Sequence, residues 1–590
     1  MVVVVVLFFK YIAIRPEGLL ASALKSPFSN SVLTQNAEKI NTVMQKESRI
    51  LSGTLEVFHE DDFVNKKATH HYLLSVGEKD DIELDNANQL LDESMNGYFV
   101  EIEVDTNNSI KKLIDKKSAA VVSQDTSNIR LIPSSTTIVS TIIHKKIATI
   151  LFNFQNNTST PYSAALAKDF VYKNDPTNSN NVNGFFNEQT YRKINLTGKV
   201  DKTGDVYGWY TLAIDDAPCN YQLWAQSAMQ QAQADGFNPT GYDTLLFIFP
   251  SATSCGWGGI ASTVTFNGGT FKGAWANSGW PGTIVHELGH SFGLEHSRAI
   301  ECTDYLGNTV AVGPNCTYID YGDPFDIMAS TFRHMNNIQK LKLGVYGTTT
   351  PNSYVKDVTT SGMYTIYNTE TPSLGTKLLK IGPYYLEYRK PYGVWDNFSL
   401  SDPVVNGITV RVGLSNSISP YIIDTTPGSQ VNDFSDAPLA SGQVFRDDTM
   451  TLMIKTLYAG PNFATVLITK NNSCIRHAPT LLPVFSNIVI PSGQSANLTV
   501  VLTNNDSAGC PPSQFHFGFD SAFFQDNIQF LPNPPLFTLN PGVSQTITVT
   551  LIPDPAVLVP GGYGSTLKVL DTTNGLYARW NTSTLNITIQ

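Results

Sequence analysis

The sequence predicts a chain of several domains: a central α/β domain with a mixed sheet, an N-terminal β-rich segment before it, and all-β sandwich domains after it. Three observations predict this. At 590 residues the chain is too long for a single hydrophobic core. Helical spacing of apolar residues is strong between residues 162 and 343 and vanishes after about residue 350. Charged residues make up only 15% of the chain, which is typical of β-rich, loop-rich proteins.

The N-terminal part reads as a leader followed by strands. Residues 1–23 combine an apolar run with an A-x-A pattern, so we predict a signal peptide. Within residues 24–135, alternation predicts strands at Leu55–Phe58 and Tyr98–Val104. The acidic run Glu60–Asp62 between them is interpreted as a solvated turn rather than a metal site.

The central domain is predicted to cover residues 136–350. An apolar strand at Lys146–Phe154 precedes an amphipathic helix at Tyr162–Val171. A second helix is expected at Tyr221–Ala234, before the near-continuous apolar run Tyr242–Phe249, which predicts an inner strand. These elements make a mixed sheet backed by helices.

A histidine-rich helix follows: His286-Glu-Leu-Gly-His-Ser-Phe-Gly-Leu-Glu-His296. His286 and His290 are four residues apart, so both imidazoles point the same way, one turn apart. Gly293 falls where the helix must end, because glycine adopts the left-handed conformation without a Cβ penalty. After that turn, His296 can complete a tripod of three imidazoles.

Three nitrogen ligands with one open position are typical of a catalytic zinc site. Zinc lowers the pKa of its bound water to about 7, and Glu287 beside it can accept the proton as general base. The alternative is coincidence, with histidines that only pack a core helix. A pattern with five fixed positions arises by chance in about 1 in 5,000 chains of this size, which favours the metal site.

A second motif lies downstream, at Tyr321-Gly-Asp-Pro-Phe-Asp-Ile-Met328. Gly322 and Pro324 predict a turn before Met328, although a methionine there is most often core filler. Together with the histidine helix, the motif resembles the metzincin signature, in which a methionine turn lies beneath the metal.

Among metzincins, the chain is most similar to the gametolysin (peptidase M11) family, over roughly residues 50 to 470. Further similarity lies in Phe247–Pro250, in Ser254–Gly259, in Trp275–Asn277 and in Asn336–Gly344. The resemblance implies a metzincin catalytic domain with zinc on three histidines, Glu287 as general base and Met328 beneath the site. Some family members carry Gln in place of the first histidine; this chain keeps His286, which favours zinc and an active site.

By position, residues 24–135 resemble a family pro-domain that shields the cleft. The segment contains no cysteine, so a thiolate cannot bind the zinc, and inhibition must use a carboxylate or steric cover. An ordinary accessory β domain is the alternative. Gly258–Val264 is expected to be the edge strand on which an extended peptide aligns, unless the turn at Asn267–Gly269 protects that edge. Trp275 and Trp280 are expected to flank the entrance as packing residues.

Phe332–Leu343 is expected to form a closing helix that carries His334 as a surface or core histidine, not as a fourth ligand. Residues 351–472 are expected to form a β domain and residues 473–590 an immunoglobulin- or fibronectin-like sandwich. Four aspartates could hold calcium, but spaced turn aspartates are usually only turn residues: Asp433, Asp436, Asp447 and Asp448.

Six cysteines fall into three close pairs, and sequential pairing is the preferred arrangement: Cys219 with Cys255, Cys302 with Cys316, and Cys474 with Cys510. Paired cysteines and many N-x-S/T sequons favour a secreted glycoprotein. A net charge of −11 argues against a nucleic-acid partner. We expect a monomer without a transmembrane segment.

The sequence therefore predicts a secreted zinc endopeptidase that hydrolyses peptide bonds of extracellular or cell-wall (glyco)proteins, the substrate class being what the resemblance implies. The alternative is a non-enzymatic adhesion or recognition protein on a retained metzincin scaffold, suggested by the accessory β domains. The intact Glu287 argues against that alternative, because a structural zinc does not need this carboxylate.

Overall fold

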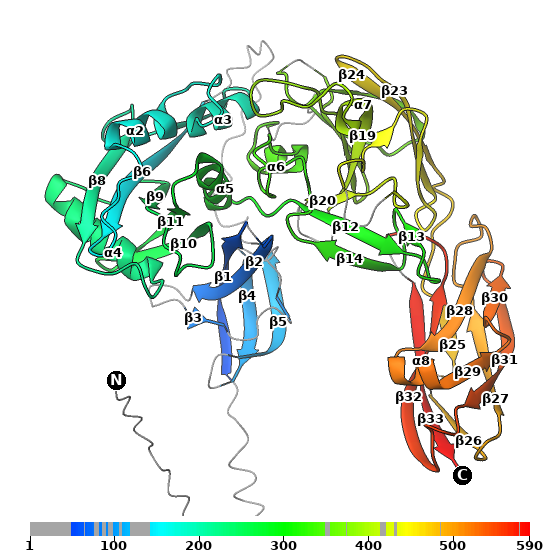
Figure 1. Cartoon of the computed structure of the whole chain (residues 1–590). Helices are drawn as coiled ribbons and strands as arrows, with labels where there is room; N and C mark the ends of the chain where they lie inside the picture. Colours follow the sequence, from blue (N-terminus) through cyan, green and yellow to red (C-terminus); the bar gives the residue numbers. More distant parts are fainter. Residues whose placement is uncertain are drawn as a thin grey trace, which may run out of the picture. The chain divides into compact units, whose positions relative to one another are not determined.

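The computed structural model describes most of residues 49–590, and the predicted signal peptide lies outside the described part. The gaps are residues 64, 76–81, 85–89, 92–97, 106–108, 119–141, 348–353, 373–374, 414–419, 430–433, 484 and 577–578. The described chain is mostly β-sheet with few helices, arranged in several sheets (Figure 1). Its described residues divide into two compact units: a smaller one within residues 49–56, 72–91 and 98–118, and a larger one within residues 57–71 and 142–590.

The smaller unit is an antiparallel β structure. The first half of β1 (Arg49–Asp62) pairs with β4 (Tyr98–Val104), and β4 pairs with β5 (Ile110–Ser118). The end of β2 (Lys67–Ser75) pairs with β3 (Ile82–Glu83). Alternate residues of β4 are buried, as the sequence pattern predicts for a strand with one covered face.

The larger unit contains a sheet of mainly parallel strands. Its centre is β6 (Ile143–Phe154), with β9 (Thr244–Phe249) parallel beside it and β11 (Gly269–Asn277) parallel to β9. β10 (Gly259–Phe266) runs antiparallel to β11. On the other side, β6 pairs in parallel with β7 (Ile194–Thr197) and β8 (Asp205–Leu212).

Helices cover both faces of this sheet, which explains why β6 and β9 read as continuous apolar runs. Ile147 and Leu151 of β6 share a core with α2 (Ala164–Tyr172), α3 (Val182–Gln189) and α5 (Pro281–Ser291). The intervening Ala148 and Ile150 share another core with α4 (Tyr221–Ala232), beside the short η4 (Gln233–Asp235).

Among the elements that the sequence did not predict are α3 and β11. The Asn181 side chain accepts a hydrogen bond from the Gly184 N–H at 2.6 Å and caps α3 at its N-terminus. The predicted helix Phe332–Leu343 is wrong over its first half: α6 spans only Asn337–Lys342, since Asn336 is its N-cap.

A second sheet contains strands from both sides of residue 350, so the predicted boundary falls within one sheet. Its strands are β12 (Arg298–Thr303), β13 (Thr309–Val310), β14 (Asn315–Ile319), β15 (Val355–Asp357), β17 (Leu378–Ile381), β18 (Tyr384–Glu387), β19 (Gly407–Gly413), β20 (Pro420–Ile423) and β21 (Leu439–Ala440). The short α7 (Pro403–Asn406) precedes β19. A further sheet shares a core with it: β16 (Gly362–Tyr367), β24 (Phe463–Lys470), β23 (Leu452–Ala459) and β22 (Val444–Asp447).

The C-terminal residues form two sheets around one apolar core. One sheet comprises β25 (Thr480–Leu482), β27 (Ala496–Thr503), β31 (Ser544–Pro553) and β29 (Ile528–Leu531). The other comprises β26 (Phe485–Ile490), β33 (Trp580–Ile589), β32 (Gly561–Asp571), β28 (Ser513–Phe519) and β30 (Leu536–Leu539), with α8 (Ala522–Asn527) between β28 and β29.

Three disulfides join the cysteines in the preferred sequential pairing: Cys219–Cys255, Cys302–Cys316 and Cys474–Cys510. Cys302 and Cys316 face each other across the β12–β14 pair, so that bridge staples neighbouring strands just after the third histidine. Helices in the described part of the chain are all too short or too polar to span a bilayer.

Candidate metal centre

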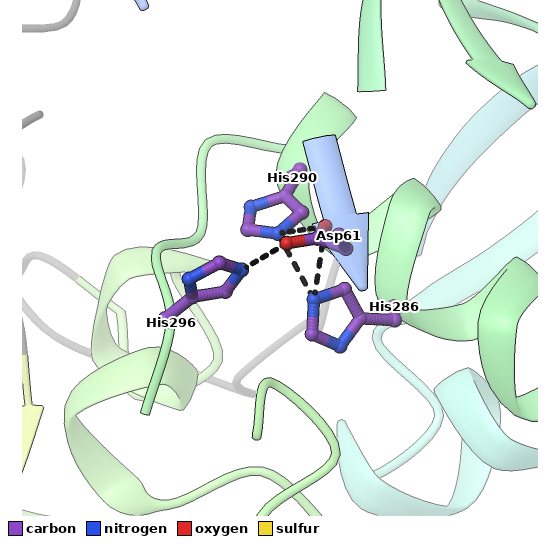
Figure 2. Close-up of side chains that lie close together, drawn as sticks. All are labelled: Asp61, His286, His290 and His296. Atoms are coloured by element: carbon purple, nitrogen blue, oxygen red, sulfur yellow. Dashed lines mark hydrogen bonds and ion pairs between the residues drawn. The ribbon is translucent and has the colours of Figure 1, made fainter. Parts of the chain in front are cut away.

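The three histidines of the predicted tripod converge. Helix α5 buries His286 and His290 on one face, and their Nε2 atoms lie 3.0 Å apart. The helix ends as predicted: Gly293 has a φ of 90°, and the Leu294 N–H returns to the Gly289 carbonyl at 3.0 Å. The chain then reverses and brings the buried His296 to the same point (Figure 2).

Backbone carbonyls fix the orientation of the two helical imidazoles. His286 Nδ1 lies 2.7 Å from the Ile327 carbonyl, and His290 Nδ1 lies 2.9 Å from the Leu294 carbonyl. A carbonyl can only accept, so each Nδ1 donates and each neutral ring presents its Nε2 lone pair. Two lone pairs facing each other at 3.0 Å repel unless a cation lies between them. The donor set therefore fits a small divalent cation such as zinc.

A carboxylate that the sequence analysis did not include completes the cluster. Asp61, in the part of β1 that belongs to the larger unit, lies between the three rings (Figure 2). Its oxygens are 2.8 Å from His296 Nε2, 3.4 Å from His290 Nε2 and 3.5 Å from His286 Nε2. The Tyr321 hydroxyl donates to the same carboxylate. One donor atom from each of the three histidines and Asp61 lies within 4.8 Å of the others.

The interpretation of Glu60–Asp62 as a solvated turn is therefore wrong for Asp61, which is fully buried. Its strand pairs with β10, some 200 residues later, and local sequence cannot reveal such a partner. Burial alone would raise the pKa of Asp61, but the charge of His296 and hydrogen bonding to the three imidazoles lower it well below its usual value.

Glu287 points its carboxylate beside the cluster. The side chain is fully buried, and neither oxygen has a hydrogen-bond partner among the described residues. It packs against Gly259 so closely that a Cβ there would lie 2.1 Å from Oε1. Burial, together with the nearby Asp61 charge, raises the pKa of Glu287 well above its usual value. A buried carboxylate with raised proton affinity can take up and release a proton within the site.

The turn that ends in Met328 lies against the helix that carries the histidines. A Cβ at Gly289 would lie 2.5 Å from the Met328 sulfur, so the absence of a side chain there admits the buried methionine. Asp326 accepts the Met328 N–H at 2.7 Å and fixes the turn. Because the preceding Ile327 carbonyl holds His286, the turn and the metal donors are coupled directly.

His296 has its own supporting carboxylate. Asp320 lies 3.2 Å from His296 Nδ1, and the Arg298 Nε donates to it at 2.8 Å. Burial alone would lower the pKa of His296, but Asp61 and Asp320 raise it to about 10. A carboxylate behind a ligating histidine orients the ring and increases its basicity.

The remaining candidates lie apart from this cluster. His334, expected as a surface or core histidine on a helix, precedes α6 and is buried between Glu188 at 3.0 Å and Asp396 at 3.2 Å. Trp275 is fully buried, whereas Trp280 is 48% exposed. Of the aspartates considered for calcium, Asp433 lies outside the described residues; Asp447 is buried and bonded to Thr449, Tyr384 and Met450, as a turn residue is.

Comparison with known proteins identifies one family. The family model described as gametolysin peptidase M11 matches residues 146–344, which include all three histidines, Glu287 and Met328. No curated protein matches the chain.

Two of the solved structures similar to this chain each match about a fifth of it. A PapD-like domain of human CEP192 is 12% identical and covers 20% of this chain and 87% of its own, with a TM-score of 0.15. The E. coli chaperone DraB is 15% identical and covers 19% of this chain and 54% of its own, also with a TM-score of 0.15. Likeness at this level carries no argument about fold or function.

Proposed function

We propose that the protein is a secreted zinc-dependent endopeptidase of the metzincin type, because residues 146–344 match the family model described as gametolysin peptidase M11. The observation that carries the proposal is the meeting of His286, His290 and His296 beside the buried carboxylate of Glu287, all inside the matched segment. The substrates we propose are extracellular or cell-wall (glyco)proteins.

We assign the residues as follows. His286, His290 and His296 would hold one zinc ion, which supplies Lewis acidity and lowers the pKa of water bound to it. Glu287 would accept a proton from the attacking water and deliver it to the leaving amide nitrogen, a transfer suited to its raised pKa. Ile327, Leu294 and Asp320 hold the rings in ligating orientation, and Met328 supports the helix from beneath.

Substrate would lie along β10. An extended peptide can pair with an open strand edge through main-chain hydrogen bonds. Gly259 of β10 touches Glu287, so a peptide on this edge passes directly over the proposed base. Residues His59–Asp61 already pair antiparallel with Gly259–Ala261, which supports this use of the edge.

The test is a Glu287→Gln variant in a zymogram on denatured protein substrates, with zinc content measured in parallel. We expect chelator-sensitive cleavage by the processed wild type, and zinc retention without cleavage by the variant processed in the same way. Glu301→Gln, a partly buried glutamate of β12, is the matched control and should cleave normally. A fully active Glu287→Gln variant would refute the mechanism; absence of chelator-sensitive cleavage by the processed form would favour an adhesion protein on the same scaffold.

A further inference from the structure

We infer that residues 59–63 act as a built-in latch on the candidate metal centre, in which Asp61 supplies a carboxylate oxygen as fourth metal ligand while its strand occupies the peptide-binding edge of β10. This inference rests on the proposed function, since it names how that same site is kept closed. It assigns to the end of β1 a ligand role and an inhibitory role.

Alternate residues of the segment all meet the histidine cluster. The His59 ring stacks on His290, with centroids 4.2 Å apart and planes 7° apart. The Phe63 ring meets His286 edge to face at 4.9 Å. Asp61 lies between them, among all three imidazoles. Residues i, i+2 and i+4 of an extended chain lie on one face, so a single face of this segment covers the site.

The backbone of the segment takes the place of a peptide. His59, Glu60 and Asp61 pair antiparallel with Ala261, Ile260 and Gly259. The Gly258 N–H also donates to the Asp61 carbonyl at 2.9 Å. Main-chain groups on this edge of β10 are therefore used by the chain itself, and a substrate strand cannot pair there at the same time.

The fit around the segment depends on glycines. Asp61 is opposite Gly259, whose missing side chain leaves room for the Glu287 carboxylate. A Cβ on Gly258 would lie 2.7 Å from the Phe63 ring. The wall of the site thus lacks side chains where the segment and the proposed base approach it most closely.

Charge in the buried site points to a metal-bound carboxylate. Asp61 and Glu287 are both fully buried, and an ionised carboxylate in such a place must be paired or must coordinate a metal. Carboxylate oxygens are ordinary zinc ligands. All six cysteines form disulfides, the first of them at Cys219, so the N-terminal segment has no thiolate for this role. Withdrawal of the segment would open the fourth ligand position and the β10 edge together.

The test uses the full chain loaded with Co²⁺, probed with acetohydroxamic acid, which chelates the metal only if the fourth position opens. Asp61→Asn keeps the shape of the side chain and weakens its ligation; Asp61→Ala removes it. Glu60→Gln is the matched control, because Glu60 lies on the opposite face of the strand, near His71. We expect both Asp61 variants to change the Co²⁺ absorption spectrum and to bind the hydroxamate at least about tenfold more tightly than wild type, because the closed state no longer competes. The control should match the wild type.

Wild-type spectra and wild-type hydroxamate affinity in Asp61→Asn would overturn the latch. A variant that binds cobalt and hydroxamate tightly but cleaves no peptide supports the latch and contradicts the proposed endopeptidase, so the two failures are distinguishable. Faster peptide cleavage by the Asp61 variants than by Glu60→Gln supports both.

Discussion

Arg411 of β19 supports the Met328 turn from behind, and its removal should loosen the metal centre without touching a proposed ligand. The guanidinium is 1% exposed and forms ion pairs with Asp323 of the turn and with Glu387 at 3.1 Å. Asp323 in turn accepts the Phe325 N–H at 3.0 Å and the Ser297 hydroxyl at 2.7 Å. The residue thus links a strand beyond residue 350 to the chain next to His296.

Arg411→Ala would leave two buried carboxylates without their shared cation, and breaking a buried pair in this way costs about 3–5 kcal/mol. Hydrogen exchange of the Phe325 and Met328 amides measures the local effect, because both donate to aspartates of the turn. At 1.4 kcal/mol per factor of ten, exchange should accelerate by about a hundredfold or more. Zinc affinity should fall as well, because the Ile327 carbonyl of this turn orients His286.

Lys168→Ala is the control, because Lys168 forms an ion pair of 2.7 Å with Asp201 at the surface, where side chains are 35% and 50% exposed. Such pairs contribute about 0–1 kcal/mol. If Arg411→Ala changed the turn amides no more than Lys168→Ala does, the reasoning that this buried network holds the turn would be refuted.

Two further predictions concern the core. Gly289→Ala should destabilise the fold by about 1–3 kcal/mol, measured as a lower thermal midpoint, because the new Cβ would meet the Met328 sulfur even though alanine is the better helix former. The loss of stability should be smaller in a Met328→Ala background. Additive effects of the two substitutions would contradict the contact. Burial alone would lower the pKa of His334, but Asp396 and then Glu188 raise it above its ordinary value of 6.5. Stability from protonated His334 should therefore be complete below pH 6.5 and be lost as pH rises through the raised pKa, and His334→Gln should remove this part of the pH dependence of urea unfolding.

Local patterns were enough to predict much of the matched domain. Three features could be read from short stretches of sequence: the i, i+4 spacing of His286 and His290, the terminating Gly293 and the continuous apolar run of β9. Each depends only on residues that are close together in the chain. The positions of Glu287 and Met328 were also given by motif, and the structure brings both beside the histidines.

Tertiary structure alone decided the features that depend on distant partners. Asp61 reads as one acid in an exposed acidic run, and only pairing with a strand 200 residues later buries it among the imidazoles. The same holds for the β12–β20 pair, which joins both sides of residue 350. It holds also for Arg411, whose buried charge is paired in part by Asp323 from the other side of that residue. A charge is stable in a protein interior only where an opposite charge or a metal lies beside it. Which residue takes that place depends on the whole folded chain rather than on any local stretch.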